Sequence, residues 1–218
     1  MPSHEFSELA RRREPPLDRF ALALAGELRE VDEDAALAAL DALGDEVTGV
    51  LAGTERTPAA ELAAVVEVLG TRHGFHGEEE DYDDPDRSML DLVLARGVGL
   101  PILLSVLYAE VARRAGIALA GVGLPGHFVV GHFGAAPVLL ADPFHRGRSL
   151  PGALAPTLVR PWTAQETALR MLNNLVSGYL TRHDLGSAIR AAELRLAVAG
   201  GDREALELEL RGLQARLN

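Results

Sequence analysis

The sequence contains no cysteine among its 218 residues. The chain therefore has no disulfide, no thiolate metal ligand and no cysteine nucleophile. Long hydrophobic runs are missing too: no window holds about eighteen uninterrupted apolar residues, so no membrane span is expected. The first sixteen residues, MPSHEFSELARRREPP, are polar and lack the apolar segment of a signal peptide. We expect a cytoplasmic protein with a flexible N-terminus at 1–16.

Positive charge is scarce: the chain has 21 Lys and Arg residues against 32 Asp and Glu residues, which gives a net charge of −11. Nucleic-acid binding relies on clustered basic residues that neutralise phosphates. The balance therefore argues against direct contact with nucleic acid or with acidic membranes. Hydrophobic residues make up 48% of the chain, which is enough to bury a core.

Helical patterns fill both ends of the chain. Residues 17–72 contain amphipathic, alanine-rich segments, with Asp32 and Thr57 placed as N-caps and Gly70 as a helix end. Residues 73–88 are acidic and irregular. Pro101 then opens a segment that is apolar all round in its first half, which predicts a buried central helix ending before Gly116. Further helices are predicted from Thr163, Asp184 and Asp202.

Three strand signals separate these helical regions. They are ALAGVGL, GHFVVGHF and VLLADPF, and the last two predict an antiparallel hairpin. The order of elements predicts an α+β fold in which a helical N-terminal bundle precedes a core with a small antiparallel sheet, and helices follow. We divide the chain into a helical region at 17–72, a core at 73–160 and a C-terminal helical region at 161–218.

His127 and Asp142 are the candidate functional pair, because the hairpin would bring an imidazole beside a carboxylate. An aspartate in that position holds the tautomer of a histidine and raises its basicity. The competing explanation is structural: a buried histidine satisfied by a neighbouring acid. His132 should face the opposite side of the strand from His127. His145 follows Asp142 closely, but the His and Asp spacing matches no standard zinc motif, and we predict no metal and no cofactor.

Two other candidates are weaker. The acidic run at 78–86 lacks the ligand positions of an EF-hand loop, and Pro85 would disturb one, so a solvated loop is expected. Ser105 lies one turn into the central helix without the G-x-S-x-G elbow of a serine nucleophile. We expect its hydroxyl to bond to a carbonyl one turn earlier.

The sequence resembles the SirB1-type branch of the transglutaminase-like superfamily over roughly residues 20–200. The resemblance is carried by GLPILLSVLYAEVARRAGI, GVGLPGHFVVGH, LLADPFHRG and RMLNNLVSGYL, preceded by the acidic DYDDPDRSMLD. It implies a papain-like α+β core. The helices at 169–182 and 185–198 are similar to one tetratricopeptide-like hairpin, a module often attached in this branch.

In catalytic members of the superfamily a cysteine opens the central helix, and a histidine and an aspartate follow on adjacent strands. The resemblance matches His127 and Asp142 to that histidine and aspartate, and places the lost nucleophile at Pro101. Leu100, Ile102, Ser105 and His145 are the expected neighbours of the cleft. Ser105 lies roughly 6 Å farther along the helix, which exceeds the displacement that catalysis tolerates.

Three functions stay open. The first is a non-catalytic module that binds a protein or peptide partner in the inherited cleft. The second is a hydrolase that uses the His–Asp pair without a cysteine nucleophile. The third is a regulatory protein that acts through another protein, since the acidic balance argues against direct DNA contact. Thiol-dependent transglutaminase or protease activity is excluded by the missing cysteine.

Overall fold

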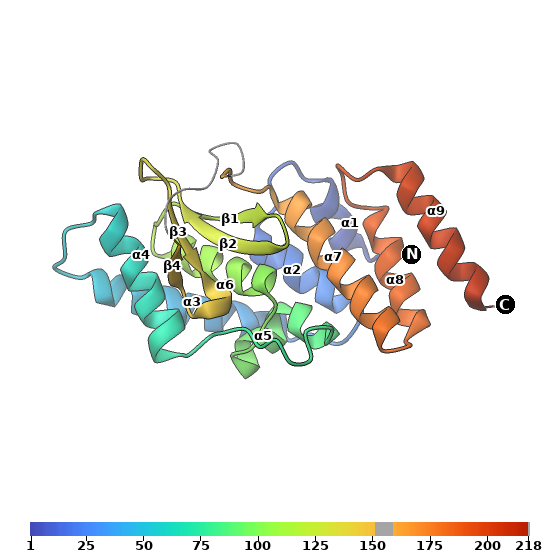
Figure 1. Cartoon of the computed structure of the whole chain (residues 1–218), viewed down its shortest axis with the longest axis horizontal. Coiled ribbons are helices and arrows are strands. Elements are labelled where there is room, and N and C mark those ends of the chain that lie inside the picture. The colour runs from blue at the N-terminus through green and yellow to red at the C-terminus, as the bar shows by residue number, and fades with distance from the viewer. Residues whose placement is uncertain (151–158, 218) are drawn as a thin grey trace.

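The computed structural model describes residues 1–150 and 159–217 of the chain. Helices and one four-stranded sheet share a continuous hydrophobic core, which confirms the predicted α+β class. In Figure 1 the sheet lies over the central helix, and the C-terminal helices extend to one side. The core includes residues from all three predicted regions. The boundaries at 72 and 160 therefore remain predictions.

The first sixteen residues include a helix that packs on the core. Helix α1 spans His4–Arg11, with Ser3 accepting a hydrogen bond from the backbone N–H of Phe6 at its N-cap. Phe6 is fully buried, and its ring lies 5.5 Å from that of Phe20, centroid to centroid. The sequence did not predict this helix, because it is short and mostly polar, with only Phe6, Leu9 and Ala10 buried.

The next helices are α2 (Leu17–Gly26), α3 (Glu33–Leu51) and α4 (Pro58–Val66). The last two begin where their capping residues predict. Asp32 and Thr57 accept hydrogen bonds from the backbone N–H groups of Ala35 and Ala60. The expected end at Gly70 is wrong, because the chain continues as a π-helical turn over Glu67–Arg72. A Cβ at Gly70 would collide with the carbonyl oxygen of Arg146, so glycine serves close packing here.

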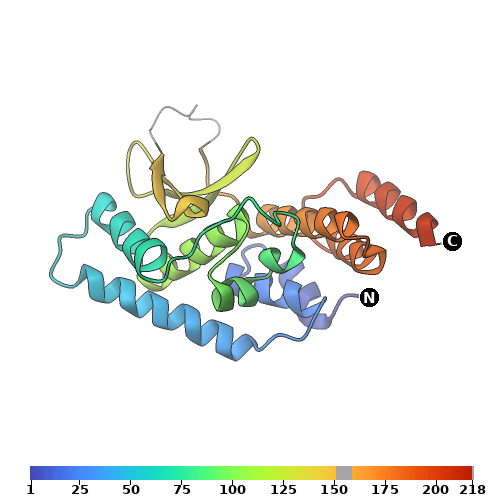
Figure 2. The same cartoon turned by 60° about the horizontal axis from the view of Figure 1, so that its bottom comes forward.

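A buried helix forms the centre of the molecule, as predicted. Helix α5 (Leu90–Arg96) ends at Gly97, whose φ of 76° is left-handed. Helix α6 (Pro101–Arg114) follows, and its first twelve residues are all buried. Figure 2 shows α6 between the sheet and the N-terminal helices. Burial on all sides explains why this segment is apolar all round.

The sheet is an antiparallel meander in the order β1 to β4. Strand β1 spans Leu119–Leu124, β2 His127–His132, β3 Leu139–Asp142 and β4 Arg148–Leu150. The predicted hairpin between the second and third strands is confirmed, with Val130 paired to Ala141. The fourth strand was not predicted, because three residues, two of them polar, give too short a pattern.

The C-terminal helices are α7 (Ala164–Thr181), α8 (Leu185–Arg195) and α9 (Arg203–Gln214). Thr163, Asp184 and Asp202 cap them as predicted. Asn173, polar in the middle of α7, accepts a hydrogen bond of 3.0 Å from the buried guanidinium of Arg195 in α8. This bond ties the two helices together. No helix in the described part of the chain is long and apolar enough to cross a membrane.

Candidate functional site

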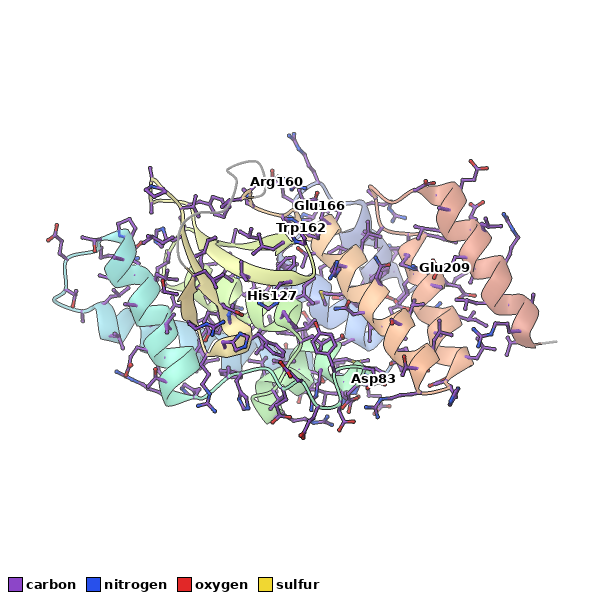
Figure 3. The ribbon with its side chains drawn as sticks, viewed as in Figure 1. Asp83, His127, Arg160, Trp162, Glu166 and Glu209 are labelled. Carbon is purple, nitrogen blue, oxygen red and sulfur yellow. The ribbon has the colours of Figure 1, made fainter. Side chains whose placement is uncertain are left out.

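Three side chains meet at one edge of the sheet. His127 opens β2, Asp142 ends β3, and His145 ends the short 3-10 turn that follows. The Nε2 atom of His127 lies 2.9 Å from Oδ2 of Asp142, and Nδ1 of His145 lies 2.8 Å from the same oxygen. The predicted approach of His127 to Asp142 is therefore observed. We call these three residues the His–Asp–His cluster; Figure 3 labels His127.

The turn after β3 sets the position of the second imidazole. Oδ1 of Asp142 accepts a hydrogen bond of 3.1 Å from the backbone N–H of Phe144, and Pro143 opens the 3-10 turn. Arg146 then adopts a left-handed conformation with a φ of 55°. The turn folds back so that His145 contacts the aspartate three residues before it. Sequence spacing alone did not show this contact.

The carboxylate is buried and the rings are accessible. Asp142 is 2% exposed, whereas the side chains of His127 and His145 are 30% and 46% exposed. Burial alone would raise the pKa of Asp142, but the contacts with His145 and His127 outweigh it and hold that pKa below its ordinary value. An ionised carboxylate only accepts hydrogen bonds, and Oδ2 faces a ring nitrogen of each histidine.

No covalent nucleophile stands where the resemblance places one. Pro101 is buried at the start of α6, and Leu100 and Ile102 belong to the core at 4% and 2% exposure. The Ser105 hydroxyl is fully buried and donates a hydrogen bond of 2.8 Å to the carbonyl oxygen of Pro101, which confirms the predicted bond. The sequence also contains no lysine, so the chain has neither a thiol nor a side-chain amine.

Ser105 instead lines a cavity elsewhere in the fold. The cavity has a volume of about 240 Å³ and lies between α6, β1 and the start of α7, with Glu110, Phe128 and Trp162 in its wall. Figure 3 shows Trp162 near Arg160 and Glu166 at the start of α7. His127 and Asp142 do not line this cavity.

Aromatic residues that the sequence analysis did not single out border the His–Asp–His cluster. The Phe144 ring meets His127 edge-on at 6.3 Å, and the half-exposed Tyr82 ring lies 6.2 Å from Phe144. Gly77 packs so closely that a Cβ there would overlap the Phe144 ring, and its N–H donates to the Phe144 carbonyl at 2.8 Å. These contacts bring the acidic loop beside the cluster.

A buried tyrosine also adjoins the cluster. Tyr108, on α6, is fully buried, and no partner for its hydroxyl is found among the described residues. Burial raises the pKa of Tyr108, and the charge of Asp142 raises it further. The hydroxyl is therefore neutral at physiological pH.

His132 belongs to a different site, as predicted from strand alternation. Its Nε2 lies 2.8 Å from Oε2 of Glu61 on α4, and its side chain is 2% exposed. Burial favours the neutral form of Glu61, but hydrogen bonds from Arg56 and His132 outweigh it and lower the pKa of this carboxyl. His132 thus anchors α4 to the sheet and cannot share a ligand with His127.

The comparisons with known proteins agree with this geometry. The family model described as the transglutaminase-like superfamily matches residues 34–176, from α3 into α7. The chain belongs to this superfamily. It is 35% identical over 163 residues to a "UPF0162 protein" of Xylella fastidiosa (strain 9a5c), covering 66% of this chain and 58% of that protein.

Two further relatives match shorter segments. A "UPF0162 protein" of Pseudomonas aeruginosa is 34% identical over 119 residues, which is 54% of this chain and 43% of that protein. "F-box only protein 21" of Mus musculus is 38% identical over 69 residues, 32% of this chain and 11% of that protein. The chain thus spans 58% or less of these relatives' lengths. No solved structure matches it.

Proposed function

We propose that this chain is a non-catalytic transglutaminase-like module that binds a protein or peptide partner at the His–Asp–His cluster. The observation that carries the proposal is that the His127–Asp142 contact is intact, whereas the start of α6 holds the buried Pro101, whose side chain has no nucleophilic atom. Acyl transfer through a thiol needs both a cysteine nucleophile and the His–Asp pair. The pair retained here can bind and orient a ligand but cannot form a thioester.

The surface around the cluster has features suited to a peptide. The rings of His127 and His145 are accessible, and Phe144 and the exposed Tyr82 add apolar area next to them. The ring nitrogens that turn away from Asp142 can hydrogen-bond to a peptide backbone. Exposed aromatic surface with a few directed polar groups is typical of binding sites.

The remaining parts of this proposal rest on resemblance. We place the chain in the SirB1-type branch and interpret α7 and α8 as a tetratricopeptide-like hairpin whose exposed face adds to the partner surface. One hairpin cannot form a stacked array, so this pair packs on the core. A cytoplasmic location and a regulatory role through another protein fit the acidic, cysteine-free composition.

The first test separates binding from turnover. Purified protein is incubated with glutamine-containing peptides and hydroxylamine, and ammonia release and hydroxamate formation are followed. We expect neither. Peptides selected from a displayed library are then titrated into wild-type protein, His127→Ala and the control His73→Ala, whose ring pairs with Glu46 elsewhere. The proposal requires that only His127→Ala weakens binding; turnover of the peptides would overturn it.

A hydrolase without a covalent step is the second candidate, and the observation in its favour is the pair of imidazoles on one carboxylate. His127 would take a proton from a water whose oxygen adds to the substrate carbonyl, and would then return the proton to the leaving group. A screen of ester and amide substrates tests it. Activity that persists in His127→Ala would remove this candidate.

A further inference from the structure

The His–Asp–His cluster has the composition of a metal centre. Two imidazole nitrogens and one carboxylate oxygen come from three separate positions in the fold, and all three lie within 4.8 Å of one another. Within residues 1–150 and 159–217, no other group of three or more His, Cys, Asp or Glu converges in this way. The spacing of these residues along the chain matches no metal motif and predicts no metal, because the turn that returns His145 to Asp142 leaves no pattern in the sequence.

From this arrangement we propose that His127, Asp142 and His145 bind one transition-metal dication of the zinc class. The inference goes beyond the proposed function, since a bound cation is compatible with either partner binding or hydrolysis. Two imidazoles select zinc, nickel, copper or iron over magnesium and calcium, which prefer oxygen ligands. Three protein ligands would leave a fourth position for water or for a partner's oxygen atom.

The distances are close to those that such an ion requires. Ligand atoms about 2.1 Å from a tetrahedral zinc lie roughly 3.4 Å apart. Here the two nitrogen–oxygen distances are 2.9 and 2.8 Å, so small rotations of the two rings would open the space for the ion. Both rings can rotate, because their side chains are 30% and 46% exposed. The carboxylate, in contrast, is fixed by its burial.

The orientation of the two rings suits coordination. The Nε2 atom of His127 and the Nδ1 atom of His145 already face Oδ2 of Asp142, and the ion would occupy the space between the rings and the carboxylate. A metal-bound imidazole carries its N–H on the other ring nitrogen. Among the described residues, neither of those outer nitrogens has a protein hydrogen-bond partner, so neither is engaged elsewhere.

The surroundings favour a cation as well. The hydrogen bond from the Phe144 N–H to Oδ1 of Asp142 leaves Oδ2 directed at the two rings, as an outer-shell contact does in metal sites. Gly77 and Tyr82 contact Phe144 and bring the acidic loop close. The chain as a whole carries a net charge of −11, which raises the local concentration of cations.

The test measures binding directly. Full-length protein is freed of metal with a chelator and titrated with zinc by calorimetry, and cobalt absorption reports the coordination geometry. We expect one zinc per chain and a higher melting temperature with zinc. His127→Ala and His145→Ala should each lose more than the roughly 10–100-fold in affinity that removal of an outer-shell partner costs. His73→Ala, which removes a ring paired with Glu46 alone, should bind zinc as wild type does.

A second substitution keeps the test decisive if truncation at the turn disturbs folding. His145→Gln retains a side-chain N–H for Asp142 but removes the imidazole, so it should fold and still lose zinc. The absence of saturable binding at micromolar zinc would overturn the proposal. Undiminished binding in a folded His145→Gln protein would do so too, because the ion would then lie elsewhere. Neither result would decide whether the surface binds a peptide, which is tested by the peptide titration.

Discussion

At the residue scale, Asp142 determines the arrangement of the candidate site. Its Oδ1 holds the turn through Phe144, and its Oδ2 holds both imidazoles. The contact with His127 could be predicted, because a hairpin places the ends of adjacent strands together. The contact with His145 could not, since it depends on the short 3-10 turn over Pro143–His145, which has no comparable pattern in the sequence.

Glu166 is a second carboxylate whose pKa is lowered by its hydrogen-bond partners, and it gives a prediction about pH. The hydrogen bond from Arg160 is the main reason that the pKa of Glu166 falls from 4.5 to about 2, and the capping N–H of Thr163 adds to it. A lowered carboxyl pKa stabilises the fold above the unfolded value of 4.5, and this contribution is lost as the pH falls toward 2. Both side chains are more than a third exposed, so solvent screens the pair.

We therefore expect Glu166→Gln to lower the free energy of unfolding by about 0.5–1 kcal/mol at pH 7. The difference from wild type should shrink steadily below pH 4.5. Urea unfolding from pH 3 to pH 8 measures it, and added salt should reduce it. A difference that is independent of pH would show that Glu166 acts through packing.

At the element scale, sequence patterns located helix starts better than helix ends. Capping side chains such as Asp32, Thr57 and Asp184 predict the start of a helix, because each accepts a hydrogen bond from a backbone N–H of the first turn. The π-helical turn over Glu67–Arg72 has no comparable local signal, and its close contact with Arg146 at Gly70 is distant in sequence. The strand β4 was missed because three residues, two of them polar, give no strand pattern.

Gly70 lies where this turn meets the segment that carries His145. We expect Gly70→Ala to destabilise the fold by about 1–3 kcal/mol, because its Cβ would collide with the Arg146 carbonyl and come close to the Tyr108 hydroxyl. Chemical unfolding measures the loss. Gly49→Ala is the matched control: it lies in α3 with open space around it, and alanine there should stabilise the helix by roughly 0.5–1 kcal/mol. Equal effects at both positions would contradict the packing argument.

At the scale of the whole molecule, the chain belongs to the transglutaminase-like superfamily but contains no cysteine. The fold class followed from the order of helical and strand patterns, and a central apolar helix opened by Pro101 marked the core. The N-terminal helix α1 could not be predicted from its sequence pattern, since its stability comes from packing of Phe6 on Phe20. The candidate site was least predictable, because it is a group of side chains that only the folded chain assembles.

The central claim is that the exposed rings of the His–Asp–His cluster are kept for a ligand and not for the fold. Unfolding free energies of His127→Ala, Asp142→Asn and the double variant test it most directly. His145 still contacts Asp142 when the His127 ring is removed. The unfolding free energy of His127→Ala should therefore stay within about 0.5 kcal/mol of the wild-type value or exceed it. A loss of about 2 kcal/mol or more in His127→Ala, with little further loss in the double variant, would show instead that the pair serves the fold.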